Sequence, residues 1–194
     1  MEYDQERFVL RNARHLAADY MMRSIREGDA VIDATMGNGK DTLFLCGLVG
    51  KNGHVYAFDV QAEAVERTRE RVREAGYAER TTLLLAGHET MGDHVRGPVQ
   101  AVMFNLGWLP GAEHAVTTKT DTTLKAVDAA LELIAPGGIV TVCVYPGHEE
   151  GMRELEALRT YVSELSVRTF NVLYHSFVNA SLQTPRLFLI QRNK

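Results

Sequence analysis

Short apolar runs rich in β-branched residues alternate with longer amphipathic segments along most of the chain. Apolar runs of this length are typical of buried strands, and the longer segments show the three- or four-residue spacing of a helix with one buried face. Residues 61–75 and 121–134 are the clearest predicted helices, and residues 8–26 are expected to form one or two more. The predicted strands are residues 30–34, 54–59, 82–85, 99–105, 139–145, 170–174 and 187–191.

The order of these segments predicts the fold. Strand, helix and strand in repeated succession indicate a parallel sheet with helices on both faces. The last two predicted strands follow one another without a helical pattern between them, which indicates an antiparallel pair. We therefore predict an α/β fold, with a Rossmann-like, doubly wound, mostly parallel sheet of seven strands and an antiparallel C-terminal strand. No linker or repeat divides the sequence, so one domain over residues 1–194 is expected.

Composition narrows the class of protein. The 194 residues are 45% hydrophobic and 24% charged, with a formal net charge of −4, which argues against binding nucleic acid through bulk charge. No long apolar run occurs and the N-terminus is acidic and polar, so we expect a cytoplasmic protein without a membrane segment. Cys46 and Cys143 lie far apart with no CxxC spacing, and we expect buried thiols and no metal site.

The first predicted strand runs into a glycine turn, with Gly37 and Gly39, and then into a helix. Glycines at such a turn let the backbone approach a ligand closely. A dinucleotide fingerprint needs a third glycine where this chain has Thr42. A phosphate loop needs a longer spacing and a hydroxyl residue after the lysine, whereas Lys40 is followed by Asp41. Neither motif explains the turn.

Two acids near the turn indicate the ligand. Asp33 lies four residues before the first glycine and could hold a cation such as an amino-acid ammonium. Asp59, at the end of the second strand, is suited to accept hydrogen bonds from both hydroxyls of a ribose. Together with the turn they suit a nucleoside that carries an amino acid and no phosphate, which describes S-adenosylmethionine. After the third strand, His88 or Glu89 could contact the adenine edge.

The fourth and fifth strands end in residues suited to orienting an amine. Asn105 precedes a flexible glycine and the only tryptophan, Trp108, in a turn that loosely resembles the Asn-Pro-Pro-aromatic turn of nitrogen methyltransferases. Methyl transfer needs a free lone pair on nitrogen, so an Asn oxygen can orient the amine hydrogens while an aromatic ring packs on the base. Tyr145 and His148 follow the fifth strand, and His148 could accept a proton near neutral pH.

Positive charge gathers in two segments, one near each end of the chain. Residues 166–194 contain no Asp or Glu. Both segments could flank the carboxyl edge of the sheet, where the parallel strands end, and take an RNA loop there. Lys119 and the threonines beside it could also meet phosphates. The basic residues of the two segments are Arg7, Arg11, Arg14, Arg23 and Arg26, and Arg168, Arg186, Arg192 and Lys194.

Taken together, these motifs resemble a known family over nearly the whole chain. It is the family of small class I S-adenosylmethionine-dependent methyltransferases once labelled rRNA methylases and now associated with the tRNA wobble uridine. The most specific block is the Asn-Leu-Gly-aromatic-Leu-Pro-Gly segment that begins at Asn105. The matching segments are DATMGNGKDTLFL (33–45), FDVQ (58–61), AGHE (86–89), FNLGWLPG (104–111), TT (117–118) and YPGHEEG (145–151).

The resemblance implies conversion of 5-aminomethyl-2-thiouridine to 5-methylaminomethyl-2-thiouridine, with S-adenosylmethionine as cofactor and the tRNA anticodon stem-loop as partner. Methylation of ribosomal RNA or a small amine, and a cofactor-binding sensor without activity, remain alternatives. A homodimer is left open. The cofactor contacts that the resemblance implies are Asn38, Asp41, Asp59, Gln61, His88 and Glu89.

Overall fold

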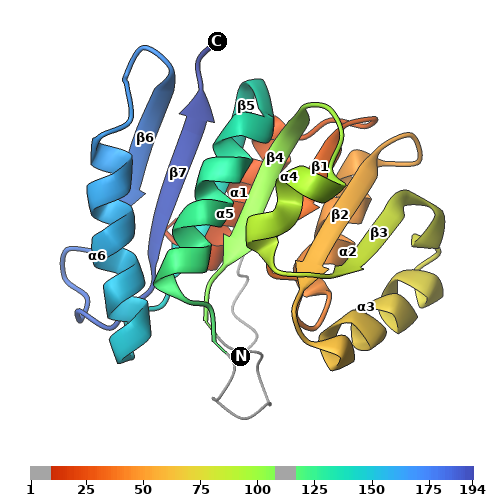
Figure 1. Ribbon diagram of the computed structural model, residues 1–194, viewed down its shortest axis with the longest axis horizontal. Helices are drawn as coiled ribbons and strands as arrows, with labels where there is room; N and C mark the ends of the chain where they lie inside the picture. Colours follow the sequence, from red (N-terminus) through yellow and green to blue (C-terminus); the bar gives the residue numbers. More distant parts are fainter. Residues whose placement is uncertain (1–9, 108–116) are drawn as a thin grey trace.

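A single seven-stranded sheet organises the protein, in the order β3-β2-β1-β4-β5-β7-β6 (Figure 1). The computed structural model describes residues 10–107 and 117–194. The strands are β1 Ala30–Asp33, β2 His54–Asp59, β3 Thr81–Leu85, β4 Val99–Asn105, β5 Ile134–Val144, β6 Phe170–His175 and β7 Arg186–Arg192. The helices are α1 Ala13–Ser24, α2 Lys40–Val49, α3 Ala62–Glu74, α4 Met91–His94, α5 Thr120–Leu133 and α6 Glu149–Ser163, with short 3-10 turns η2 Ala78–Arg80 and η3 His88–Thr90.

The strand pairings confirm the predicted fold class. Strands β1 to β5 pair in parallel, whereas β7 runs antiparallel to both β5 and β6. The chain starts at β1 and builds outward to β3, then returns to place β4 on the other side of β1. In open α/β sheets, ligands bind at such a switch point, beyond the carboxyl ends of the strands. The fold therefore directs attention to the loops that follow β1 and β4.

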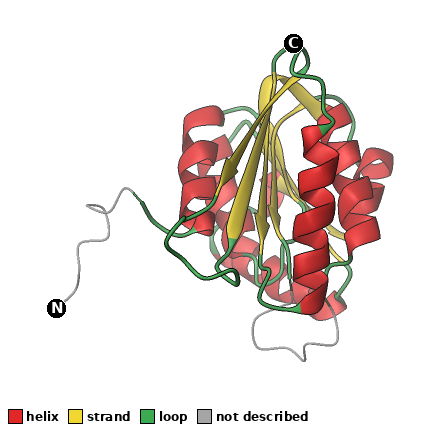
Figure 2. Cartoon of the chain, turned by 90° about the vertical axis from the view of Figure 1, so that its left-hand side faces the viewer, coloured by secondary structure: helices red, strands yellow, loops and turns green. Residues whose placement is uncertain are grey.

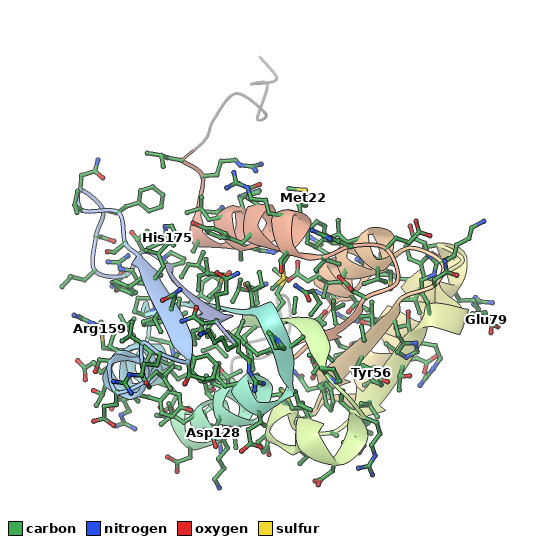
Figure 3. All side chains as sticks on the ribbon, turned by 90° about the horizontal axis from the view of Figure 1, so that it is seen from above. Met22, Tyr56, Glu79, Asp128, Arg159 and His175 are labelled. Atoms are coloured by element: carbon green, nitrogen blue, oxygen red, sulfur yellow. The ribbon has the colours of Figure 1, made fainter. Side chains whose placement is uncertain are left out.

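Helices cover the sheet on both faces, as Figures 2 and 3 show from two directions. In Figure 3, Met22 on α1 and Asp128 on α5 lie on opposite sides of the sheet. Alternate strand residues supply the two cores: Val31 of β1 packs in the cluster with α1 and α2, and its neighbour Ile32 packs in the cluster with α5 and α6. Burial on both faces explains why the central strands are continuous apolar runs.

Two elements differ from the sequence prediction. The helix α6 was not predicted, although Leu155, Leu158 and Val162 give it one buried face between charged residues. Strand β5 begins at Ile134, five residues before the predicted start, and includes the Pro136-Gly137 pair that was expected only to stop the preceding helix. The pairing of β4 with β5 shifts register at that point, which lets the strand accommodate residues that normally interrupt a ladder.

Candidate active site

A cavity of about 750 Å³ opens at the carboxyl edge of the sheet, around the ends of β1, β2, β3 and β4. Its volume lies in the range of small-molecule sites. Most of the predicted site residues meet there. The predicted residues that line it are Gly37, Asn38, Asp41, Asp59, Gln61, His88, Glu89, Asn105 and Tyr145. Asp33, Gly39 and His148 lie outside this lining.

The glycine turn between β1 and α2 forms one wall. Gly37 and Gly39 have φ angles of 49° and 74°, which L side chains rarely adopt. The hydroxyl of Thr68 donates a hydrogen bond to the Gly37 carbonyl at 3.1 Å. A Cβ added at Gly39 would lie 2.8 Å from that hydroxyl oxygen, so the backbone approaches α3 as closely as glycine alone allows. Although Gly39 does not line the cavity, it therefore fixes the shape of the turn that does.

Asp59 stands at the tip of β2 with both carboxylate oxygens anchored. One oxygen accepts from the Gly37 amide at 3.0 Å and the other from the Gln61 amide at 2.9 Å. Burial raises the pKa of Asp59, and these backbone donors oppose the rise. Since each carboxylate oxygen has more than one lone pair, the group can still accept hydrogen bonds from two ligand hydroxyls. At the position predicted for a ribose-binding acid, Asp59 is thus a hydrogen-bond acceptor whose orientation is fixed by the backbone.

Asp33 lies behind the turn and is only 1% exposed. It accepts hydrogen bonds from the Thr42 hydroxyl at 2.6 Å and from the Thr35 amide at 3.2 Å. Burial, and then the charge of Asp41, raises the pKa of Asp33 to about 7. Asp33 therefore supports the turn from below, and its charge changes near neutral pH.

His88 and Glu89 supply the wall beyond β3. His88 is 8% exposed, and its ring meets Phe104 edge-on with centroids 5.7 Å apart. Burial lowers the pKa of His88, whereas the charge of Glu89 and a hydrogen bond to the Ala34 backbone oppose this shift. One ring nitrogen is therefore engaged by Ala34, which leaves the other nitrogen and the Glu89 carboxylate for the edge of a purine ring.

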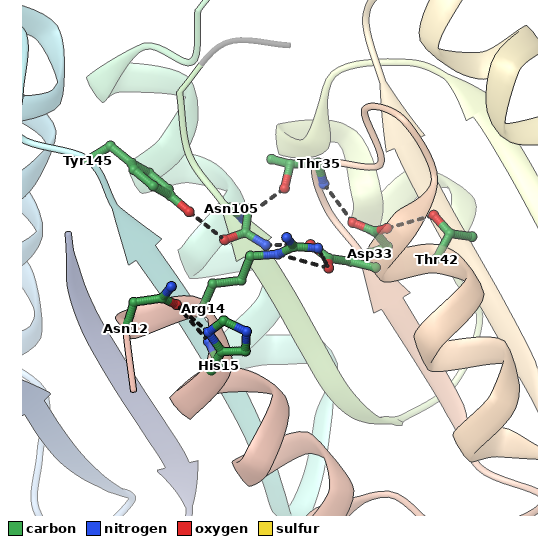
Figure 4. Close-up of polar contacts among 9 residues, drawn as sticks. Asn12, Arg14, His15, Asp33, Thr35, Thr42, Asn105 and Tyr145 are labelled. Carbon is green, nitrogen blue, oxygen red and sulfur yellow. Dashed lines mark hydrogen bonds and ion pairs between the residues drawn. The ribbon is translucent and has the colours of Figure 1, made fainter. Parts of the chain in front are cut away.

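A chain of hydrogen bonds crosses the cavity from α1 to the end of β5 (Figure 4). Arg14 binds one oxygen of Asp41, with Nη2 at 2.7 Å and Nε at 3.3 Å, and the side-chain amide of Asn105 donates to the other oxygen. The Tyr145 hydroxyl donates to Asn105 Oδ1 at 3.4 Å. Burial raises the pKa of Tyr145 to about 12, so its phenol keeps its proton at neutral pH.

The remaining residues singled out in the sequence lie at a helix terminus, in the cavity wall, in the core or outside the described residues. His148 is the N-cap of α6, and its Nδ1 accepts from the Gly151 amide at 3.1 Å. The Thr118 hydroxyl accepts from the Gly107 amide at 2.9 Å and lies in the cavity wall with Lys119. Trp108 and the rest of its block up to residue 111 lie outside the described residues. Cys46 and Cys143 are buried free thiols, as expected.

The two basic segments do not gather at one edge. Arg186 lies at the carboxyl edge but is 5% exposed and bonded to nearby carbonyls. Arg192 pairs in register with Phe170 at the opposite end of the sheet, where Arg23 and Arg26 also lie, beside Gln191. Arg7 lies outside the described residues. The described basic residues of the two segments do not all flank the carboxyl edge, because α1 and β7 each run from one end of the strands to the other.

Sequence reasoning missed the place of Arg14 in this site. It was noted only as one of several N-terminal arginines, yet it lines the cavity and pairs with Asp41. The spacing of Arg14 from Asp41 carries no signal, since they meet only when α1 packs across β4, β5 and β7. Within the described residues, no three His, Cys, Asp or Glu side chains are grouped to hold a metal ion. No helix there is long and apolar enough to cross a membrane.

Comparisons with known proteins identify related chains over nearly the whole length of this one. A tRNA (mnm(5)s(2)U34)-methyltransferase, chloroplastic, from Arabidopsis thaliana is 36% identical over 195 residues, covering 95% of this chain and 71% of the relative. SMU.1697c from Streptococcus mutans, solved in complex with SAH, is 34% identical with a TM-score of 0.86, covering 95% and 99% of the two chains.

The fold, the cavity and these relatives define an S-adenosylmethionine-dependent methyltransferase. A model of the family described as "Putative rRNA methylase" matches residues 55–191, and the chain belongs to that family. A solved Clostridium thermocellum chain that carries the same description is 38% identical, with a TM-score of 0.93 and coverage of 95% of this chain and 100% of that one.

Proposed function

We propose that this enzyme methylates the primary amine of 5-aminomethyl-2-thiouridine at the wobble position of tRNA, giving 5-methylaminomethyl-2-thiouridine. The observation that carries the proposal is Asn105, whose side-chain oxygen lies at the cavity beside the Tyr145 hydroxyl. The name of the Arabidopsis thaliana relative supports the choice of acceptor. The side-chain oxygen of Asn105 and the hydroxyl oxygen of Tyr145, at the ends of β4 and β5, can accept hydrogen bonds from an amine. A carbon acceptor or an apolar edge has no such hydrogens to donate.

The acceptor must first lose a proton. An alkylamine with a pKa near that of lysine, about 10.4, is protonated at pH 7, and freeing its lone pair costs about 5 kcal/mol at 1.36 kcal/mol per pH unit. A cavity that excludes water from the ammonium lowers this cost, because desolvation disfavours the charged form. Asn105 then accepts a hydrogen bond from an amine hydrogen, so the lone pair is directed away from Asn105 and toward the methyl donor. Water takes the released proton, because His148 lies outside the cavity lining and its Nδ1 accepts from the Gly151 amide.

When bound, S-adenosylmethionine would supply an activated methyl group on its sulfonium and would leave as the thioether once the amine nitrogen had taken that methyl group. Asp59 binds the ribose hydroxyls, and Gln61 lies beside it in the cavity wall. His88 and Glu89 contact the adenine. Asn38 and the backbone at Gly37, which line the cavity, would hold the methionine part, and Asp33 would act only by supporting the turn behind them.

The proposed partner is the anticodon stem-loop of tRNA, and Lys119 in the cavity wall is suited to a phosphate next to the modified base. The acceptor nucleotide must leave its stack to reach the cavity, as bases do in other enzymes that modify them. A homodimer and a cytoplasmic location stay predictions. Native gel filtration and fractionation of cells would check them.

The proposed function is tested by incubating the enzyme and S-adenosylmethionine with tRNA purified from a strain that lacks this gene, and measuring methyl transfer. We expect 5-methylaminomethyl-2-thiouridine to appear by nucleoside mass spectrometry, and 5-aminomethyl-2-thiouridine to accumulate in the deletion strain. An unchanged nucleoside profile in the deletion strain would refute the proposal. Labelling of ribosomal RNA or a small amine instead would favour the alternative acceptors.

The role of Asn105 has its own test. Asn105→Ala should abolish turnover on the tRNA while cofactor binding by calorimetry persists. The matched control is Asn171→Ala, because Asn171 lies on β6 at the far end of the sheet, where its side chain bonds only Asn193 among the bonds described. Wild-type turnover in Asn105→Ala would exclude the orienting role.

A further inference from the structure

The two oxygens of Asp41 have different partners. Oδ1 accepts two hydrogen bonds from the guanidinium of Arg14, and Oδ2 accepts from the side-chain nitrogen of Asn105. The Asp41 side chain is 15% exposed, and that of Arg14 is 44% exposed. The carboxylate is thus enclosed between a cation from α1 and an amide from β4, at the cavity wall that both elements share.

This arrangement determines which way the Asn105 amide faces. An ionised carboxylate only accepts hydrogen bonds, so the amide nitrogen must point to Asp41 and the amide oxygen must point away from it. The oxygen then faces the Tyr145 hydroxyl, which donates to it. The Asn105 backbone is fixed as well, because its amide donates to the Thr35 hydroxyl at 2.8 Å. Without Asp41, nothing described on that side of Asn105 prevents the amide from turning by 180°.

A turned amide would present NH₂ to the cavity where an oxygen is needed. Two donors, the amide and the incoming amine, would then face each other, and the amine lone pair would be drawn away from the methyl donor. Arg14 restricts rotation of the Asp41 carboxylate, because its guanidinium binds the carboxylate oxygen that does not contact Asn105. Arg14 is itself held by α1, where Ala13 and Ala17 are buried against the sheet.

We propose that Asp41 is a positioning residue that orients the Asn105 amide for the acceptor amine, and that Arg14 acts through Asp41. This inference rests on the proposed function for the identity of the acceptor. It differs from the expectation that Asp41 contacts the cofactor. A cofactor ligand would govern cofactor affinity, whereas a positioning residue governs turnover of the bound complex.

Kinetics separate these roles. Asp41→Ala should lower kcat on the tRNA about a hundredfold, the loss typical of a misplaced reacting group, with the dissociation constant of S-adenosylmethionine unchanged. Arg14→Met, which keeps the apolar stem, should lower kcat about tenfold in the wild-type background and have no further effect in Asp41→Ala. Weakened cofactor binding in Asp41→Ala, or an undiminished Arg14→Met effect in the double variant, would overturn the assignment.

A spectroscopic measurement tests the contact without any acceptor. The side-chain ¹⁵N–¹H₂ signals of Asn105 are identified by their loss in Asn105→Ala, and they should shift in Asp41→Ala and Arg14→Met. The control is Asp19→Ala, which breaks the 2.7 Å ion pair between Asp19 on α1 and Arg11, just before that helix, away from the cavity. Signals that do not move in Asp41→Ala would refute the contact. Shifted signals in an enzyme that leaves the tRNA unmethylated would retain the positioning and refute only the acceptor.

Discussion

Replacement of Asp33 by Asn should remove much of the pH dependence of the protein's stability. The folded protein keeps a proton on Asp33 up to a pKa of about 7, whereas the unfolded chain releases it near 3.8. Between these values the folded state binds more protons than the unfolded state, so the free energy of unfolding decreases as pH rises. The cause is burial of the carboxylate, reinforced by the charge of Asp41.

The magnitude follows from the two pKa values. The interval from 3.8 to about 7 corresponds to about 4 kcal/mol at 1.36 kcal/mol per pH unit. About 3 kcal/mol of this falls between pH 5 and pH 8, because the unfolded carboxyl is already ionised at pH 5. The side-chain amide introduced by Asp33→Asn does not ionise, and it can accept from the Thr35 amide while donating to the Thr42 hydroxyl, so its geometry is tolerated.

Urea unfolding of both proteins without cofactor, at pH 5 and at pH 8, measures the difference. From pH 5 to pH 8, the free energy of unfolding of the wild type should fall by up to about 3 kcal/mol more than that of Asp33→Asn. The difference reports on Asp33 because all other titrating groups are common to both proteins. Asp19→Asn, a substitution of the same kind in a partly exposed ion pair, should behave as the wild type does. Parallel pH profiles for the wild type and Asp33→Asn would refute the reasoning, because Asp33 would then have an ordinary pKa in the folded protein.

Two further substitutions probe the cofactor wall. Asp59→Asn should weaken S-adenosylmethionine binding tenfold or more by calorimetry, because both Asp59 oxygens accept backbone amides and an NH₂ group would oppose one of them; unchanged affinity would exclude the ribose contact. Gly39→Ala should destabilise the protein by about 1–3 kcal/mol in thermal unfolding, because the φ angle of 74° and the 2.8 Å approach to Thr68 both disfavour a Cβ. Its control is Gly47→Ala within α2, where a Cβ meets nothing within 4 Å and stability should not fall.

Much of the cofactor wall could be predicted because the relevant signals are local. Asp59 and Asn105 each end an apolar run, and the ends of parallel strands meet at one edge of a sheet. The glycine turn follows β1 directly. For these residues, knowledge of the strand order was enough to bring distant positions together, and the predicted antiparallel closing strand is also present.

The contacts of Arg14 and the distribution of positive charge required the packed structure. A helix of 12 residues is about 18 Å long, so Arg14 at the start of α1 and Arg23 at its end lie near opposite edges of the sheet. Composition cannot tell which end of a helix reaches the site. The same applies to Arg192, since the direction of β7 decides its edge.

The reversal of β7 also separates one segment of the carboxyl edge from the proposed cofactor wall. Because β6 ends and β7 begins at the carboxyl edge, residues 176–185 form a hairpin connection there, near the turn that follows β5. The Cβ position at Gly147 lies 4.0 Å from the Gln183 carbonyl. The proposed cofactor wall, by contrast, is built by the loops after β1, β2 and β3. The hairpin can therefore be shortened, extended or replaced without altering the loops that would hold the methyl donor, so the two sides of this edge are separable targets for redesign.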